Sequence, residues 1–129
     1  MAEDPLGADQ EIVRFTPVGG AIIVEVLPRR IFLETAEKFR ERILQVVQEA
    51  CADVVLDLRS VSVMNSTALG TLIVAHDLLK KRGRKLVLAS PGRILREVLE
   101  RMRLDTLFTV CDTLEDALAT VGTVQKTPR

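Results

Sequence analysis

The sequence predicts an α/β domain in which a small mixed β-sheet of about five strands packs with about four α-helices. Two observations predict this class. Short β-branched apolar runs alternate along the chain with segments whose apolar residues recur at helical spacing. The 129 residues, 47% of them hydrophobic, suffice for one sizeable core. Because strands separated by helices usually run parallel, most of the sheet is expected to be parallel.

The predicted elements follow the order ββαβαβαβα. Short β-prone runs predict strands at residues 11–16, 21–27, 54–58, 85–89 and 107–110. Helical spacing predicts helices at residues 35–50, at residues 66–82, after Ser90-Pro91 and after residues 112–115. Gly19-Gly20 marks the turn between the first two strands.

Local signals predict where these helices begin and end. Ser90 is the expected cap of the third helix, with Pro91 at its first position. Asp112 is expected to cap the fourth helix in a capping box, and Gly83 is a natural stop for the second. The expected buried face of the second helix is marked by Leu69, Leu72, Ile73, His76 and Leu79.

The chain is expected to form one domain over residues 11–120. Residues 1–10 and 122–129 have the composition of loose termini. Lys+Arg and Asp+Glu are both 18, and this zero net charge disfavours a nucleic-acid partner. No apolar stretch approaches the roughly 20 residues of a membrane span, and the start of the chain has no secretory signal. We therefore expect a cytoplasmic protein without membrane insertion.

The chain offers little for catalysis or for a cofactor. Cys51 and Cys111 match no metal-binding spacing and are expected to be buried or half-buried thiols. No Ser-His-Asp triad can be assembled from spacing, and Gly19-Gly20 lies between two strands rather than before a helix, as a phosphate loop would. We expect no enzymatic activity, no metal and no cofactor.

Asn65, Ser66 and Thr67 stand where the second helix is expected to begin. The first N–H groups of a helix are unpaired and its dipole is positive there, so this place suits an anion, a phosphoryl group or a partner's carboxylate. Capping alone is the simpler interpretation of such residues. The basic run at residues 80–85 complements the dipole at the other end of this helix, or forms a patch for acidic partners, nucleotide phosphates or RNA.

The run Asn65-Ser66-Thr67-Ala68-Leu69-Gly70 resembles the signature Asp-Ser-Ser/Thr-Gly-Leu-Gly of the STAS domain, the fold of bacterial anti-sigma factor antagonists. The flanking segments are similar as well. Val-Val-Leu-Asp-Leu at 54–58 resembles the family's strand before the signature, and residues 83–88 resemble its return strand. The resemblance spans roughly residues 11–120 and implies a STAS-like fold.

In that family, a partner kinase, often the anti-sigma factor itself, phosphorylates the first serine of the signature, and only the unphosphorylated form binds the partner. The resemblance therefore implies a bacterial regulator of transcription that binds an anti-sigma factor or similar serine kinase-type regulator and carries its phosphorylation site at Ser66. It leaves the oligomeric state open, a dimer included. The implied partner-binding residues are Asn65, Ser66, Thr67, Ala68, Arg29 and Arg30.

Three departures from the family pattern bear on this site. Asn65 replaces the usual Asp, which keeps a capping side chain but removes a negative charge. Ala68 replaces the usual Gly and adds a methyl group where a partner is expected to approach. Arg29 and Arg30 invert the charge of a loop that normally lies near the phosphorylation site, and there they would pair with a phosphate on Ser66.

Two other functions stay open on the sequence alone. The chain would also suit a STAS subunit of a membrane transporter for lipids or anions, which would need no phosphorylation. A nucleotide-binding or small-ligand-binding STAS module would use the same helix start.

Overall fold

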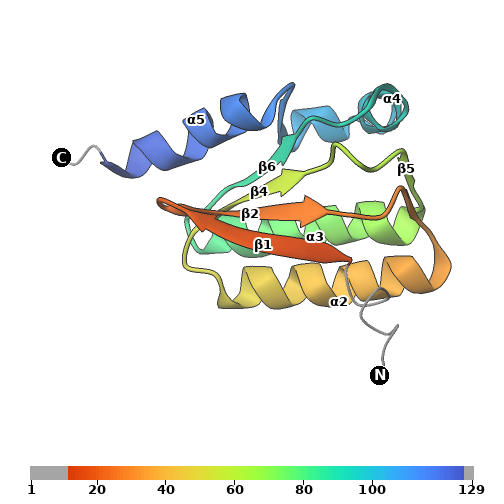
Figure 1. The fold of residues 1–129 in the computed structure, drawn as a ribbon, viewed down its shortest axis with the longest axis horizontal. Coiled ribbons are helices and arrows are strands. Elements are labelled where there is room, and N and C mark those ends of the chain that lie inside the picture. Colours follow the sequence, from red (N-terminus) through yellow and green to blue (C-terminus); the bar gives the residue numbers. More distant parts are fainter. Residues whose placement is uncertain (1–11, 127–129) are drawn as a thin grey trace.

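A computed structural model describes residues 12–126 and, within them, a central five-stranded sheet (Figure 1). The strand order is β1-β2-β4-β6-β7. β1 is antiparallel to β2, and the other neighbours are parallel. The strands are β1 (Val13–Val18), β2 (Ala21–Val26), β4 (Asp53–Asp57), β6 (Leu86–Ala89) and β7 (Thr109–Cys111).

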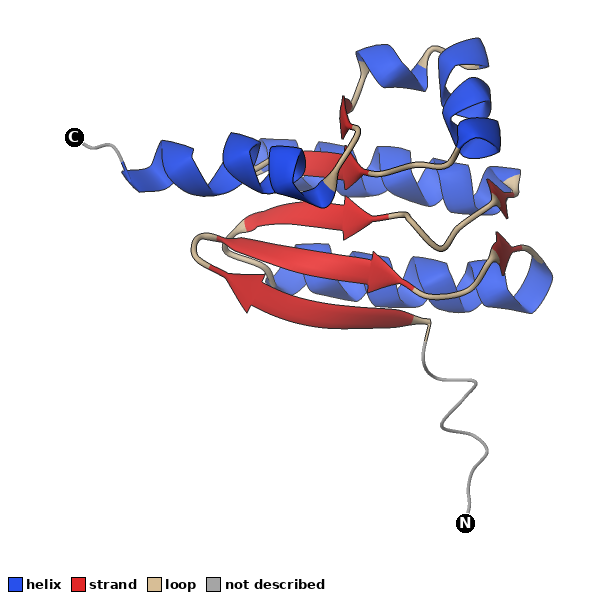
Figure 2. Cartoon of the chain, turned by 45° about the horizontal axis from the view of Figure 1, so that its top comes forward, coloured by secondary structure: helices blue, strands red, loops and turns tan. Residues whose placement is uncertain are grey.

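Helices cover both faces of this sheet. Figures 1 and 2 show two of them side by side on one face and another on the opposite face. The described part of the chain holds four α-helices: α2 (Leu33–Glu49), α3 (Ser66–Lys81), α4 (Arg93–Arg101) and α5 (Leu114–Lys126). The larger core lies under α2 and α3, and a smaller one lies under α5. The expected α/β class, with a small mixed sheet and four helices, is confirmed.

β4 shows why the sequence pattern predicts the centre of the sheet. Its five residues are all buried, with Val54 and Leu56 in the larger core and Val55 in the smaller one. A parallel strand covered on both faces is expected to be a nearly continuous apolar run. The run at residues 54–58 therefore reflects burial on two sides.

Two short strands were not predicted. β3 (Arg30–Ile31) pairs in parallel with β5 (Val63–Met64), apart from the main sheet. Two residues are too few to show an alternating pattern. This small ladder places the segment before α2 beside the segment before α3.

Two predicted helix caps are wrong. Ser90 does not cap α4, which begins at Arg93 after Gly92. The N–H of Ser90 still donates to the carbonyl of Cys111 at 2.9 Å, so the chain leaves the sheet later than expected. At α5, the hydroxyl of Thr113, not Asp112, accepts from the N–H of Asp116 at 3.0 Å.

Several other boundaries and burial states also differ from the predictions. The first strand lies at Val13–Val18, and the 3₁₀ helix Leu104–Thr106 displaces the last strand to Thr109–Cys111. α5 runs to Lys126, into the segment expected to be a loose tail, while the predictions for residues 1–10 and 127–129 lie outside the described residues. Ile73 is 40% exposed, and the thiol of Cys51 is exposed. His76, on the expected buried face of α3, is half-buried.

α2 and α3 are joined at both ends. At their C-terminal ends, Nη1 of Arg82 donates to the carbonyl oxygens of Val47 at 2.8 Å and Ala50 at 3.2 Å. Val47 lies in the last turn of α2 and Ala50 directly follows it, where carbonyl groups have no partner within the helix. The β3–β5 ladder joins the other ends.

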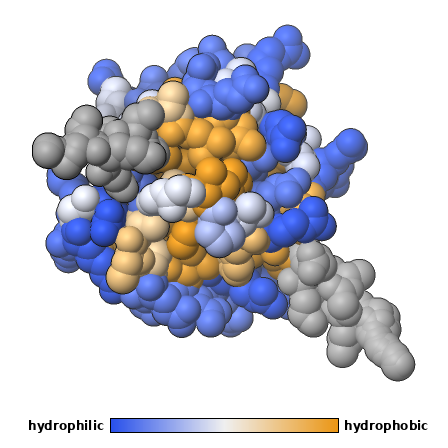
Figure 3. All heavy atoms as spheres, turned by 60° about the vertical axis from the view of Figure 1, so that its left-hand side comes forward, coloured by the Kyte–Doolittle hydropathy of each residue, from blue (hydrophilic) through white to orange (hydrophobic). Residues whose placement is uncertain are grey.

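The β1–β2 hairpin leaves apolar surface uncovered at one side of the molecule. Phe15 is 44% and Val18 40% exposed, and Ile23 is only partly buried. Figure 3, which brings the left-hand side of Figure 1 forward, shows apolar atoms gathered on this side. Within residues 12–126, no helix combines the length and the apolar character that crossing a membrane requires.

Candidate functional site

Ser66 is the first residue of α3, at the edge where the parallel strands of the sheet end. β4 ends at Asp57, and the chain then passes through β5 before α3 begins. In open α/β sheets, ligands commonly bind outside the carboxyl ends of the strands. The candidate site therefore lies where such a fold usually recognises a ligand or partner.

Asn65 caps α3 as the sequence predicts. Its Oδ1 accepts from the N–H of Ala68 at 3.0 Å, and its carbonyl oxygen accepts from the N–H of Leu69 at 3.0 Å. Within residues 12–126, the N–H groups of Ser66 and Thr67 have no acceptor. Both side chains are exposed. The helix start thus offers a hydroxyl group and two free N–H donors to a partner.

Ala68 lies inside the fold, not on the surface where it was expected. It is fully buried in the larger core. The methyl group that distinguishes it from glycine therefore packs against core side chains, and it cannot meet a partner without a rearrangement. Within the signature, Ser66 and Thr67 are exposed, Asn65 and Gly70 are half-buried, and Ala68 and Leu69 are buried.

The backbone of Arg29 and Arg30 lies beside the segment that leads into Ser66. The carbonyl oxygen of Arg29 accepts from the N–H of Ser62 at 2.7 Å, and that of Ile31 accepts from the N–H of Asn65 at 3.0 Å. Both arginine side chains are exposed. The expectation that this loop lies near the helix start is confirmed, and its pairing with a phosphate stays a prediction.

An open hollow of about 840 Å³ adjoins Ser66, between the first turns of α2 and α3. It is lined by Phe32, Leu33, Glu34, Thr35, Glu37, Asn65 and Thr67. Sequence reasoning missed Phe32 and Leu33. The available signal was two large apolar residues where a helix begins, one of them at the position where a capping residue is usual.

An ion pair holds the link between β4 and Ser66. Asp57 is 2% exposed, and it accepts from the N–H of Arg59 at 3.2 Å, from its Nε at 3.2 Å and from its Nη2 at 3.0 Å. This contact raises the pKa of the Arg59 guanidinium. The pair thus joins the last residue of β4 to the turn that follows it.

Gly70 lies one turn beyond Ser66 in α3. A Cβ built there would meet no atom within 4 Å, and its φ is not in the left-handed region. Glycine inside a helix is destabilising by roughly 0.5–1 kcal/mol relative to alanine, and nothing in the fold requires it here. Because Gly70 has no side chain, none projects from α3 between Thr67 and the exposed Ile73 and Val74.

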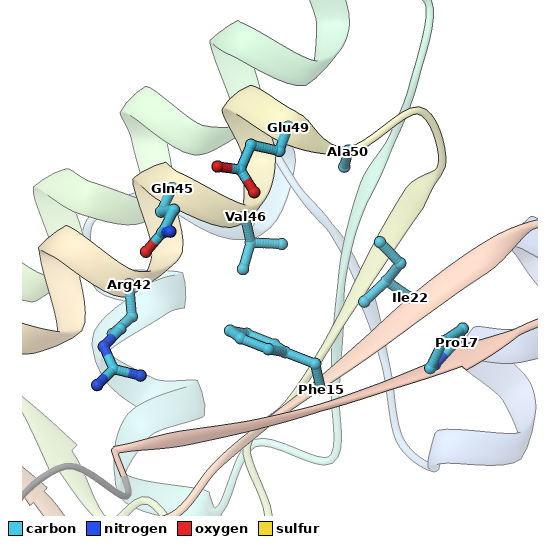
Figure 4. A pocket seen from close by; sticks show the side chains of 8 residues that line it. All are labelled: Phe15, Pro17, Ile22, Arg42, Gln45, Val46, Glu49 and Ala50. Carbon is cyan, nitrogen blue, oxygen red and sulfur yellow. The ribbon is translucent and has the colours of Figure 1, made fainter.

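Other concave features do not add to this site. A groove of about 460 Å³ lies between β1 and the C-terminal half of α2. Figure 4 shows the side chains of Phe15, Ile22 and Val46 pointing into it. Its lining is mainly apolar, with Arg42, Gln45 and Glu49 on the helix side. Within residues 12–126, no group of three or more His, Cys, Asp or Glu side chains could hold a metal ion.

The protein is a small α/β domain whose candidate site is a capped helix start. The family model for the STAS domain matches residues 16–117. This match covers most of the chain, which therefore belongs to the STAS domain family.

Solved structures agree with this assignment. An anti-sigma factor antagonist from Mycobacterium paratuberculosis is 28% identical, with a TM-score of 0.73 over 84% of this chain and 92% of that one. A sulfate transporter family protein from Wolinella succinogenes is 25% identical, with a TM-score of 0.70 over 86% and 93%. The Bacillus cell fate determinant SpoIIAA in its phosphorylated form is 18% identical, with a TM-score of 0.65 over 84% and 97%.

Proposed function

We propose that this protein is an anti-sigma factor antagonist-like switch, which binds a kinase-type anti-sigma factor and is regulated by phosphorylation of Ser66. One observation carries the proposal: in a chain that belongs to the STAS family, Ser66 is exposed beside two free N–H groups at a capped helix start, in a run that resembles the family signature. Similar folds include an anti-sigma factor antagonist and a phosphorylated SpoIIAA. In this role the protein would act in the cytoplasm on transcription and have no catalytic activity of its own.

Phosphorylation at this position would change binding more than folding. A phosphate adds about −1.5 to −2 charge, and a helix start accommodates an anion. A partner surface shaped for a small hydroxyl would instead have to desolvate a dianion, which is costly. The proposed contact surface comprises Asn65, Ser66 and Thr67, continues over Gly70, and includes Arg29 and Arg30.

The modification is tested by mass spectrometry of the protein isolated from its own cells. We expect phosphate on Ser66, and no phosphate on that peptide in a Ser66→Ala variant. In binding assays with the partner, Ser66→Asp should lose affinity while Ser66→Ala retains it. Ser66 without phosphate under all growth conditions, together with unchanged binding by Ser66→Asp, would contradict the switch.

A transporter role is the second candidate, favoured by the likeness to the Wolinella sulfate transporter family protein. The two roles predict different partners. Purification from the native cells should recover a kinase-type regulator if the switch proposal holds. Recovery of a lipid or anion transporter component, with Ser66 unmodified, would favour the transporter role.

A nucleotide-binding role is less well supported by the side chains at the helix start. The hollow beside Ser66 is lined by Glu34 and Glu37 and by no lysine or arginine. Carboxylates repel the phosphates of a nucleotide. We expect ATP and GTP to leave the midpoint of thermal unfolding unchanged. A rise in that midpoint would instead support a nucleotide-binding role.

A further inference from the structure

The start of α2 breaks two local rules in adjacent residues. Phe32 occupies the N-cap position and its side chain makes no capping hydrogen bond. Apolar residues are among the least favoured there. Leu33 has φ of 52°, in the left-handed region that glycine, asparagine and aspartate tolerate best. Backbone strain of this kind tends to persist at functional sites.

Packing within the fold does not explain these residues. Leu33 is 81% exposed, the largest exposed fraction among the exposed large apolar residues of the described chain, and Phe32 is 39% exposed. A leucine that is strained and also solvated contributes little to the core. The two side chains instead present apolar surface to the outside, next to the helix start that carries Ser66.

The charges around this apolar pair indicate what would cover it. Phe32 and Leu33 line the same hollow as Thr67, and Glu34 and Glu37 line it too. Among residues 12–126, neither glutamate has an ion-pair partner. A basic side chain would complement the two carboxylates, while its aliphatic stem would pack against the apolar pair.

We propose that Phe32 and Leu33 form an apolar anchor for the partner bound at Ser66: the partner supplies an apolar pocket for Leu33 and a lysine or arginine that enters the adjoining hollow. This rests on the proposed function, because the hollow shares Asn65 and Thr67 with the proposed contact surface. The anchor would add partner specificity that is independent of the phosphorylation state. Interfaces commonly concentrate binding energy in such central apolar residues bordered by polar ones.

The decisive variant is Leu33→Gly, because it should change stability and binding in opposite directions. Glycine relieves the left-handed strain, so the thermal midpoint should rise by about 2–6 °C. Loss of one leucine from an interface should weaken binding about 10- to 100-fold. Leu33→Met keeps an apolar side chain and serves as the matched control. Its thermal midpoint and its binding affinity should both be close to those of the wild type. Val18→Ala changes another exposed apolar residue, at the opposite edge of the sheet, and should not affect binding.

The binding probe is obtained from an extract of the protein's own cells. It is the protein that binds to the wild-type chain and does not bind to the Ser66→Asp variant. It is identified by mass spectrometry, purified, and titrated calorimetrically against each variant. Glu34→Gln combined with Glu37→Gln should weaken binding and reduce its dependence on salt, as expected for a lost contact with a basic side chain.

The outcomes separate this proposal from the switch itself. If Ser66→Asp abolishes binding but Leu33→Gly binds within about twofold of wild type, the anchor is wrong and the switch stands. If the wild-type chain retains no protein that the Ser66→Asp variant fails to retain, both the anchor and the switch are contradicted. A change in self-association of Leu33→Gly in analytical ultracentrifugation, with partner affinity unchanged, would show that Leu33 contacts a second copy, and this also overturns the anchor.

Discussion

The starts of α2 and α3 lie side by side at one edge of the molecule, and they are built in opposite ways. α3 begins with Asn65, whose side chain closes a capping hydrogen bond at 3.0 Å. α2 begins with Phe32, which makes no such bond, and with Leu33 in a left-handed conformation. One start is stabilised locally, while the other combines backbone strain with exposed apolar side chains. The contrast shows that two neighbouring helix starts of one fold differ in local stability, with a closed cap at α3 and none at α2.

The sharpest test of this contrast makes the same substitution in both helices. Leu72 in α3 is fully buried, so Leu72→Ala should reduce the free energy of unfolding by about 2–5 kcal/mol. Leu33 in α2 is 81% exposed, and alanine there keeps the same backbone strain, so Leu33→Ala should change it by less than about 0.5 kcal/mol. Urea denaturation measures both. Comparable losses in the two variants would show that Leu33 packs in solution and would remove the contrast.

A smaller effect is expected at the cap itself. Asn65→Ala removes the acceptor for the N–H of Ala68 and should reduce the free energy of unfolding by about 1 kcal/mol. Asn65→Asp restores a capping oxygen and should be close to wild type in the same urea titration. An Asn65→Ala protein as stable as wild type would mean that the helix start finds another acceptor.

The smallest effect concerns charge at the start of α3. Ser66→Asp places a negative charge near the positive end of the helix dipole and should increase the free energy of unfolding by about 0.3–1 kcal/mol at low salt. Because salt screens this interaction, the increase should shrink as salt is raised towards about 1 M. Thermal unfolding at several salt concentrations provides the measurement. A destabilised variant would argue that a phosphate on Ser66 also disturbs the fold.

Features set by local chemistry or by strong burial could be predicted from the sequence. The run at residues 54–58 predicts β4 because that strand is buried on both faces, and Asn65 is predicted as a cap because capping depends on a few adjacent atoms. The position of Arg29 beside the helix start came from the family resemblance, and the β3–β5 ladder supports it.

Features set by tertiary context could not be predicted. A hydroxyl before a proline predicts a cap at Ser90, but the N–H of Ser90 donates to the carbonyl of Cys111 and the helix begins later, at Arg93. Helical spacing predicts Ile73 on the buried face of α3, but spacing does not define how wide that face is, and Ile73 is 40% exposed. The hollow beside Ser66 joins two helices that are far apart in sequence, so no local pattern indicates it.

The two ties between α2 and α3 have a consequence for how recognition could evolve. The β3–β5 ladder fixes one end of the helix pair, and the hydrogen bonds of Arg82 to Val47 and Ala50 fix the other. With both ends held, exposed residues in the first turns could be exchanged without moving the helices, and under the proposed function such exchanges would change which partner is bound. The two helices therefore keep their relative positions when surface residues change. Duplicated copies of such a gene could acquire separate partners through a few surface substitutions while the core stays the same.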